Sequence, residues 1–145
     1  MKGKILKDWQ NREKSVQELH NDSKLCISEI NFINDEIRFL EHLLSATYID
    51  CLAAGLYKKI EEFVHKLKEQ KTVGTTLKIV INEQETILSD LINNDSVSSN
   101  KNFLENHNKL EFEMNYYIKK YKRFKKQIFD IVENVMKQKE QKKLI

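Results

Sequence analysis

The chain contains no proline, and only three of its 145 residues are glycine. Proline and glycine mark most tight turns, so their scarcity argues against a turn-rich all-β fold. It argues equally against a collagen-like chain, which needs glycine at every third position. The two absences together favour a few long helices joined by short connections.

Cysteine and long apolar runs are scarce as well. Cys26 and Cys51 are the only cysteines, too few for a disulfide framework. No segment approaches the roughly 18 apolar residues of a membrane-spanning helix, and no signal-peptide pattern follows Met1. Hydrophobic residues still make up 40% of the chain, which is enough for a buried core. We therefore expect a folded cytoplasmic protein.

Apolar residues recur at alternating steps of three and four along most of the chain. This spacing is that of the a and d positions of a heptad, which lie on one side of a helix. The first row is Val16, Leu19, Ser23, Cys26, Ile30, Ile33, Ile37, Leu40, Leu44 and Thr47. The second is Leu56, Ile60, Phe63, Leu67, Gln70, Gly74, Leu77, Ile81, Gln84, Leu88 and Leu91. The third is Phe103, His107, Leu110, Met114, Tyr117, Tyr121, Phe124, Ile128, Ile131 and Val135.

Few residues interrupt these rows, and the interruptions set the expected helix boundaries. The polar run 93–100 predicts a loop, and a second break is predicted within Ser45–Leu56, around Ala53–Gly55. We therefore expect helices over about 4–52, 56–93 and 100–142. Because short connections make neighbouring helices antiparallel, the expected fold is all-α. It is a single domain over 1–145, an elongated antiparallel three-helix bundle with coiled-coil-like heptad packing.

The start of the first helix is less defined. Ser15 and Glu18 fit a capping box, in which each side chain accepts a hydrogen bond from the other residue's backbone N–H. A softer break is also expected at Asn21–Ser23. Residues 1–20 therefore continue the first helix, fold back to make a fourth helix, or fray.

A second apolar row lies on the outer side of the first helix. Leu25, Phe32, Phe39 and Ala46 repeat every seven residues, and Leu43 flanks them. They occupy a heptad position about 100° from the d row, where a helix with two neighbours needs no apolar residue. Burying one such side chain is worth about 1.5–3 kcal/mol, so a covering partner is favoured.

Two coverings of this row are possible from the sequence. Residues 1–20 could fold back over it, or a second protein could pack on Leu25, Phe32, Phe39 and Leu43. The apolar phase runs from Trp9 into Cys26 without a slip, which favours one continuous helix. We therefore predict a homodimer or homo-oligomer, or contact with another helical protein, most simply with two-fold symmetry.

Charge is segregated along the chain although the net charge is only +3. Residues 16–57 sum to −5 and residues 115–145 to +7. Parallel packing of the first and third helices would place the acidic side chains beside residues 115–127. Those side chains are Glu29, Asp35, Glu36 and Glu41. The alternative is a nucleic acid or anionic membrane partner bound by the basic helix over 119–143. The residues that would contact it are Lys119, Lys120, Lys122, Arg123, Lys125 and Lys126.

Candidate metal ligands and nucleophiles are few. Glu62 and His65 have the Glu-x-x-His spacing of ferritin-like di-iron bundles, and the spacing of His107 and Glu111 resembles that of hemerythrin-like bundles. Each occurs once, whereas such sites need further inward ligands. No phosphate-binding glycine loop or nucleophile motif is present. We therefore predict no catalytic residue, metal, cofactor or small-molecule substrate, and a non-enzymatic scaffold or adaptor that acts through helix–helix association.

Overall fold

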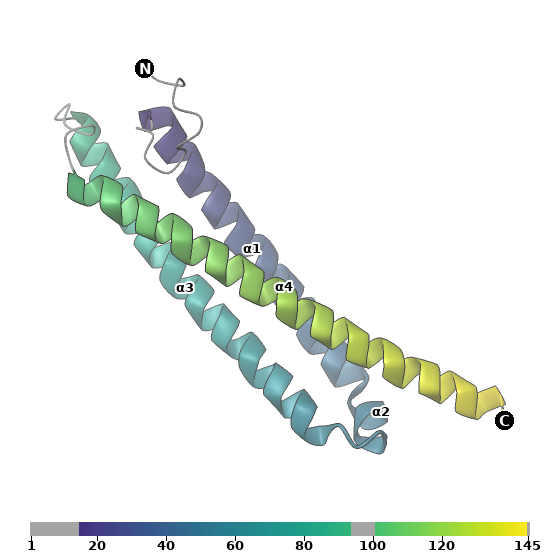
Figure 1. Cartoon of the computed structure of the whole chain (residues 1–145). Helices are drawn as coiled ribbons and strands as arrows, with labels where there is room; N and C mark the ends of the chain where they lie inside the picture. The colour runs from purple at the N-terminus through teal and green to yellow at the C-terminus, as the bar shows by residue number, and fades with distance from the viewer. Residues whose placement is uncertain (1–14, 94–100, 145) are drawn as a thin grey trace. The chain divides into compact units, whose positions relative to one another are not determined.

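The computed structural model describes residues 15–93 and 101–144. Its regular structure over these residues is helical throughout, which confirms an all-α bundle (Figure 1). The helices are α1 (Val16–Ala46), α2 (Tyr48–Ala53), α3 (Tyr57–Asn93) and α4 (Lys101–Leu144). None of the described helices carries an apolar stretch of the length that a bilayer crossing requires.

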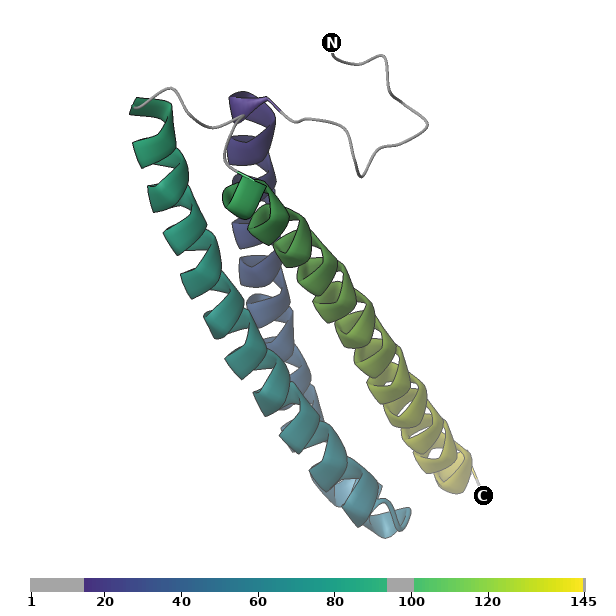
Figure 2. The same cartoon turned by 60° about the vertical axis from the view of Figure 1, so that its left-hand side comes forward.

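The chain divides into two compact units, and each takes a part of α1, α3 and α4. Unit 1 comprises residues 1–30 and 76–115. Its hydrophobic cluster joins Leu19 of α1, Leu88 of α3 and Phe103 of α4, with Leu91 and Leu104 packed against it. Beyond Leu19 on α1, His20 contacts Glu85 of α3, which precedes Leu88 in the sequence. Asp22 of α1 contacts His107 of α4, which follows Phe103. Within unit 1, α3 therefore runs antiparallel to the other two helices (Figure 2).

Unit 2 comprises residues 31–75 and 116–145 and includes α2. Glu36 of α1 accepts a hydrogen bond from Tyr121 of α4, and Asp50 accepts one from Lys139. Asp50 lies in α2, and both partners advance together along the chain, so the segment that runs from α1 into α2 is parallel to α4 within this unit. The core of the unit is almost entirely apolar. Its buried hydrophobic residues are Ile33, Ile37, Leu40, Leu44, Cys51, Ile60, Phe63, Leu67, Tyr117, Tyr121, Phe124, Ile128, Val132 and Val135.

Most members of the three predicted rows are buried, but Val16 is exposed and Cys26, Leu56, Leu91 and Ile131 are only half-buried. Two buried residues, Cys51 and Val132, lie outside the rows. Near the end of α4 the row steps from Ile128 to Val132, and Ile131 is only half-buried. An α-helix has 3.6 residues per turn, so its inward face drifts against a strict 3.5-residue repeat. The step of four residues from Ile128 to Val132, where the heptad repeat predicts a step of three to Ile131, corrects this drift.

The first turn of α1 has the predicted capping box. The Glu18 backbone N–H donates to Ser15 Oγ at 3.1 Å, and the Ser15 N–H donates to Glu18 Oε1 at 3.0 Å. The expected start of this helix near residue 4 lies outside the described residues. The predicted break at Asn21–Ser23 is wrong, because α1 runs through it and Ser23 is buried. A fold-back at this point is therefore excluded, and the arrangement predicted for residues 1–14 lies outside the described residues.

The first predicted helix, to about residue 52, is divided in the structure into α1 and α2. α1 ends at Ala46, where Thr47 adopts φ −102° and ψ 7° before α2 begins. The Thr47 hydroxyl donates to the Leu43 carbonyl at 2.8 Å, a local bond that bends helices. The break predicted at Ala53–Gly55 is present, because α2 ends at Ala53.

Gly55 makes the turn from α2 into α3. Its φ is +77°, in the left-handed region. The Gly55 N–H donates to the Leu52 carbonyl and the Leu56 N–H donates to the Cys51 carbonyl, both at 3.0 Å. These are the two bonds of a Schellman motif, which commonly places glycine at this position.

Replacing Gly55 with alanine is expected to destabilise the protein by about 1–2 kcal/mol, because an L-residue with a Cβ strains at this φ. A Cβ at Gly55 would meet no atom within 4 Å, so the cost is conformational rather than steric. Urea denaturation followed by circular dichroism measures it. Gly55→Asn, which tolerates the left-handed region better, should recover part of the loss. Equal stability of the alanine variant and the unchanged protein would contradict this account.

Candidate protein-interaction site

The outer face of α1 in unit 2 exposes two phenylalanine rings. Phe32 and Phe39 keep 58% and 57% of their surface accessible. Each directly precedes a buried residue, Ile33 or Leu40. Successive helix positions differ by about 100°, so the packing that buries Ile33 and Leu40 turns both rings outward. Both therefore lie where the sequence predicted an apolar face.

Leu43 and Leu25 complete the predicted interface, but Leu43 is less exposed than the two rings and Leu25 belongs to unit 1. Leu43 is only half-buried, because it sits at the flank of the α1 row. Leu25, in unit 1, is 65% exposed. The rings of Phe32 and Phe39 are thus the main exposed apolar feature of α1 in unit 2, and their role in an interface stays a prediction.

The edge of this face carries both signs of charge. Asp35 and Arg38 form an ion pair within α1, and both side chains are well exposed. Asn31 and His42 beside the rings and Glu29, one turn before the first ring, are also exposed. The opposite charges of Asp35 and Arg38 cancel each other at this edge. A second copy of the same face would approach it without strong repulsion.

In unit 2, the acidic stretch of α1 contacts the basic stretch of α4 through part-buried hydrogen bonds and an ion pair. Glu36 accepts hydrogen bonds from Tyr121 Oη at 2.7 Å and from Lys125 Nζ at 2.8 Å. Burial raises the pKa of Glu36, but the bonds from Lys125 and Tyr121 outweigh it and lower the pKa overall. The predicted contact of Glu36 with residues 115–127 is confirmed. Glu41 instead contacts Lys71 of α3 at 3.3 Å.

The basic face of α4 is partly occupied by contacts within the chain. Lys125 pairs with Glu36, and Lys126 pairs with Asp130 at 2.9 Å. Lys120 lies 5.9 Å above the ring of Phe124. Lys119, Lys122 and Arg123 form no ion pair with any described residue. Three aromatic rings of this stretch, Tyr117, Tyr121 and Phe124, are buried, so they are not available to stack on nucleic acid bases, whereas Tyr116 is 63% exposed.

Unit 1 brings three possible metal ligands together. His107 Nε2 lies 3.0 Å from Asp22 Oδ2 and 4.0 Å from Glu111 Oε2. One ligand atom of each residue lies within 4.8 Å of the others. His107 is 3% exposed, and its ring stacks on Phe103 with centroids 6.3 Å apart. Sequence spacing identified His107 and Glu111 but gave no signal for Asp22, which lies 85 residues earlier.

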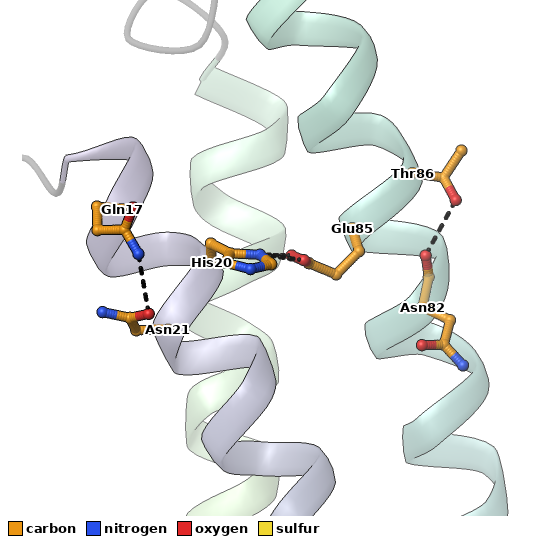
Figure 3. Close-up of polar contacts among 6 residues, drawn as sticks. All are labelled: Gln17, His20, Asn21, Asn82, Glu85 and Thr86. Atoms are coloured by element: carbon orange, nitrogen blue, oxygen red, sulfur yellow. Dashed lines mark hydrogen bonds and ion pairs between the residues drawn. The ribbon is translucent and has the colours of Figure 1, made fainter.

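The remaining histidine–carboxylate pairs lie on the surface. His20 of α1 points across to Glu85 of α3, with its Nδ1 2.7 Å from a carboxylate oxygen (Figure 3). The predicted pair Glu62 and His65 does not converge, because Glu62 bonds Lys66 and His65 faces Glu69. The hydrogen bond from Lys66 lowers the pKa of Glu62. Neither arrangement gathers more than one carboxylate at a histidine.

No protein-family model, curated protein or solved structure matches this chain. Evidence for its function therefore comes from the described residues themselves.

Proposed function

We propose that this protein is a non-enzymatic helical scaffold or adaptor that associates with a second copy of itself through the face of α1 around Phe32 and Phe39. One observation carries the proposal. Two large aromatic rings, seven residues apart on one helix, stay more than half exposed although the core beside them is complete. Covering each ring is worth about 1.5–3 kcal/mol, which is a strong drive for association.

A second copy suits this face because the face is self-complementary. In an antiparallel pair of α1 helices, Phe32 of one copy can lie opposite Phe39 of the other. The two-fold axis then repeats the same contact, so both ring pairs are formed at once. The nearly neutral edge at Asp35 and Arg38 adds no net repulsion. The α4 face, with Lys119, Lys122 and Arg123, would repel its own copy.

The solution mass tests this proposal. Light scattering on a sizing column at physiological salt should give twice the chain mass of 17.3 kDa, about 35 kDa. The double variant Phe32→Glu/Phe39→Glu should elute near the mass of one chain with unchanged helical circular dichroism, because buried charges oppose the interface.

The matched control is Phe112→Glu. Phe112 is 74% exposed on α4 of unit 1, so this variant also exchanges an exposed phenylalanine for a charge. It should keep the dimer mass. A single-chain mass for the unchanged protein across a wide concentration range would refute the proposal. Unfolding of the double variant would instead assign the two rings to the core of one chain.

A further inference from the structure

A polar layer interrupts the core of unit 1. One helical turn beyond Leu19, Leu88 and Phe103, the inward positions hold Ser23, Gln84 and His107. All three are buried, and Gln84 Oε1 has no hydrogen-bond partner among the described residues. Buried polar groups cost stability unless they are satisfied, so apolar residues would pack better here. A layer of this kind needs an explanation beyond packing.

His107 directs one nitrogen at two carboxylates. Asp22 Oδ2 and Glu111 Oε2 lie 3.0 and 4.0 Å from the same atom, Nε2. Glu111 follows His107 by one turn of α4, so both side chains project from the same side of the helix. Asp22 arrives from α1. Burial and the stacked ring of Phe103 restrict how the imidazole can turn.

These distances suit a shared metal ion. Zinc binds imidazole nitrogen at about 2.0–2.1 Å and carboxylate oxygen at about 2.0–2.2 Å. Two atoms bound to one ion are therefore at most about 4.2–4.3 Å apart. Both distances from Nε2 fall inside this limit. The carboxylates of Asp22 and Glu111 are partly exposed, so they can adjust and leave solvent a route to the ion.

We propose that Asp22, His107 and Glu111 bind one divalent transition-metal ion, of the zinc class, between α1 and α4 of unit 1. One imidazole and two carboxylates form a borderline-hard ligand set, which suits zinc, manganese or ferrous iron better than calcium or cuprous copper. The ion takes the place of the hydrogen between His107 Nε2 and Asp22, and the imidazole binds it in the neutral form with its proton on Nδ1 while any excess proton leaves to solvent. Water completes the coordination, and the bound ion ties α1 to α4.

Zinc binding to tag-free, chelator-treated full-length protein tests the site. Titration calorimetry with Zn²⁺ should give one ion per chain, and saturating Zn²⁺ should raise the melting temperature, since a ligand that binds the folded state stabilises it. Substituting Co²⁺ should produce visible absorption bands that Zn²⁺ displaces. His107→Gln and Glu111→Gln should each weaken binding by roughly ten-fold or more, because even indirect partners of a ligand matter that much.

The matched control is His20→Gln, which removes the surface histidine that contacts Glu85 in the same unit. It should leave the zinc affinity, the stoichiometry and the melting shift unchanged. If His107→Gln fails to fold, Glu111→Gln still tests the site, because Glu111 is partly exposed and its substitution should not disturb the core. Absence of stoichiometric zinc binding, or equal affinity in Glu111→Gln and the unchanged protein, would overturn the proposal. The contact between Asp22 and His107 would then be an ordinary hydrogen bond between α1 and α4.

Discussion

Replacing Phe63 with alanine is expected to lower the free energy of unfolding by about 3–5 kcal/mol. Phe63 is almost fully buried on α3 in the core of unit 2. Its removal loses the apolar burial of the ring and leaves a cavity that the surrounding helices cannot close completely. Total stabilities of proteins of this size are about 5–15 kcal/mol, so the variant should be close to unfolding.

Urea denaturation monitored by circular dichroism measures this loss. Phe112→Ala is the matched control, because the same ring is removed from an exposed site of α4. Its stability should stay within about 0.5 kcal/mol of the unchanged protein. Similar losses in both variants would mean that burial of Phe63 does not decide the stability of the bundle.

Alkaline pH is expected to destabilise the protein through two buried tyrosines of α4. Burial raises the pKa of Tyr117 to about 12. Burial also raises the pKa of Tyr121, with a further contribution from its hydrogen bond to the Glu36 carboxylate. In the unfolded chain both phenols lose their protons near pH 10. The folded state therefore binds more protons than the unfolded state above that pH, and stability falls as the pH rises.

The sign and size of this effect are specific. Below about pH 10 both phenols are neutral in both states, so their contribution to stability is complete. Between about pH 10 and 12, Tyr117 alone should remove at most about 1.4 kcal/mol per pH unit, or about 2 kcal/mol over this range. Urea denaturation across this range measures the loss. Near-ultraviolet absorbance of tyrosinate should show two phenols that ionise only as the protein unfolds.

Two phenylalanine variants separate these tyrosines from other groups that titrate in alkali. Tyr117 Oη is buried and has no hydrogen-bond partner among the described residues, so Tyr117→Phe should leave stability at neutral pH unchanged or higher. Tyr121→Phe removes the bond to Glu36 and should cost about 1.5–3 kcal/mol. Each variant should also flatten the alkaline loss of stability. An unchanged alkaline profile in both would contradict the assignment.

The helical fold follows from the sequence because its signals are local. The alternating three- and four-residue spacing predicts which residues are buried, and burial of Ile37, Phe63 and Ile128 agrees with it. The Ser15–Glu18 capping box and the turn at Gly55 are likewise set by neighbouring residues. Local signals were weaker at Thr47, because the heptad row continues through this residue although α1 ends at Ala46.

The candidate interface was also predictable from the sequence, since a heptad row that buries Ile33 and Leu40 must expose Phe32 and Phe39. Only the tertiary structure could decide the contacts between distant residues. It places Asp22 at His107 and Glu36 at Tyr121, each pair 85 residues apart in the sequence. Heptad spacing fixes which side of a helix faces inward, whereas partners across helices depend on the register between them. That register comes from the packing of whole side-chain layers, and no short segment of the chain contains it.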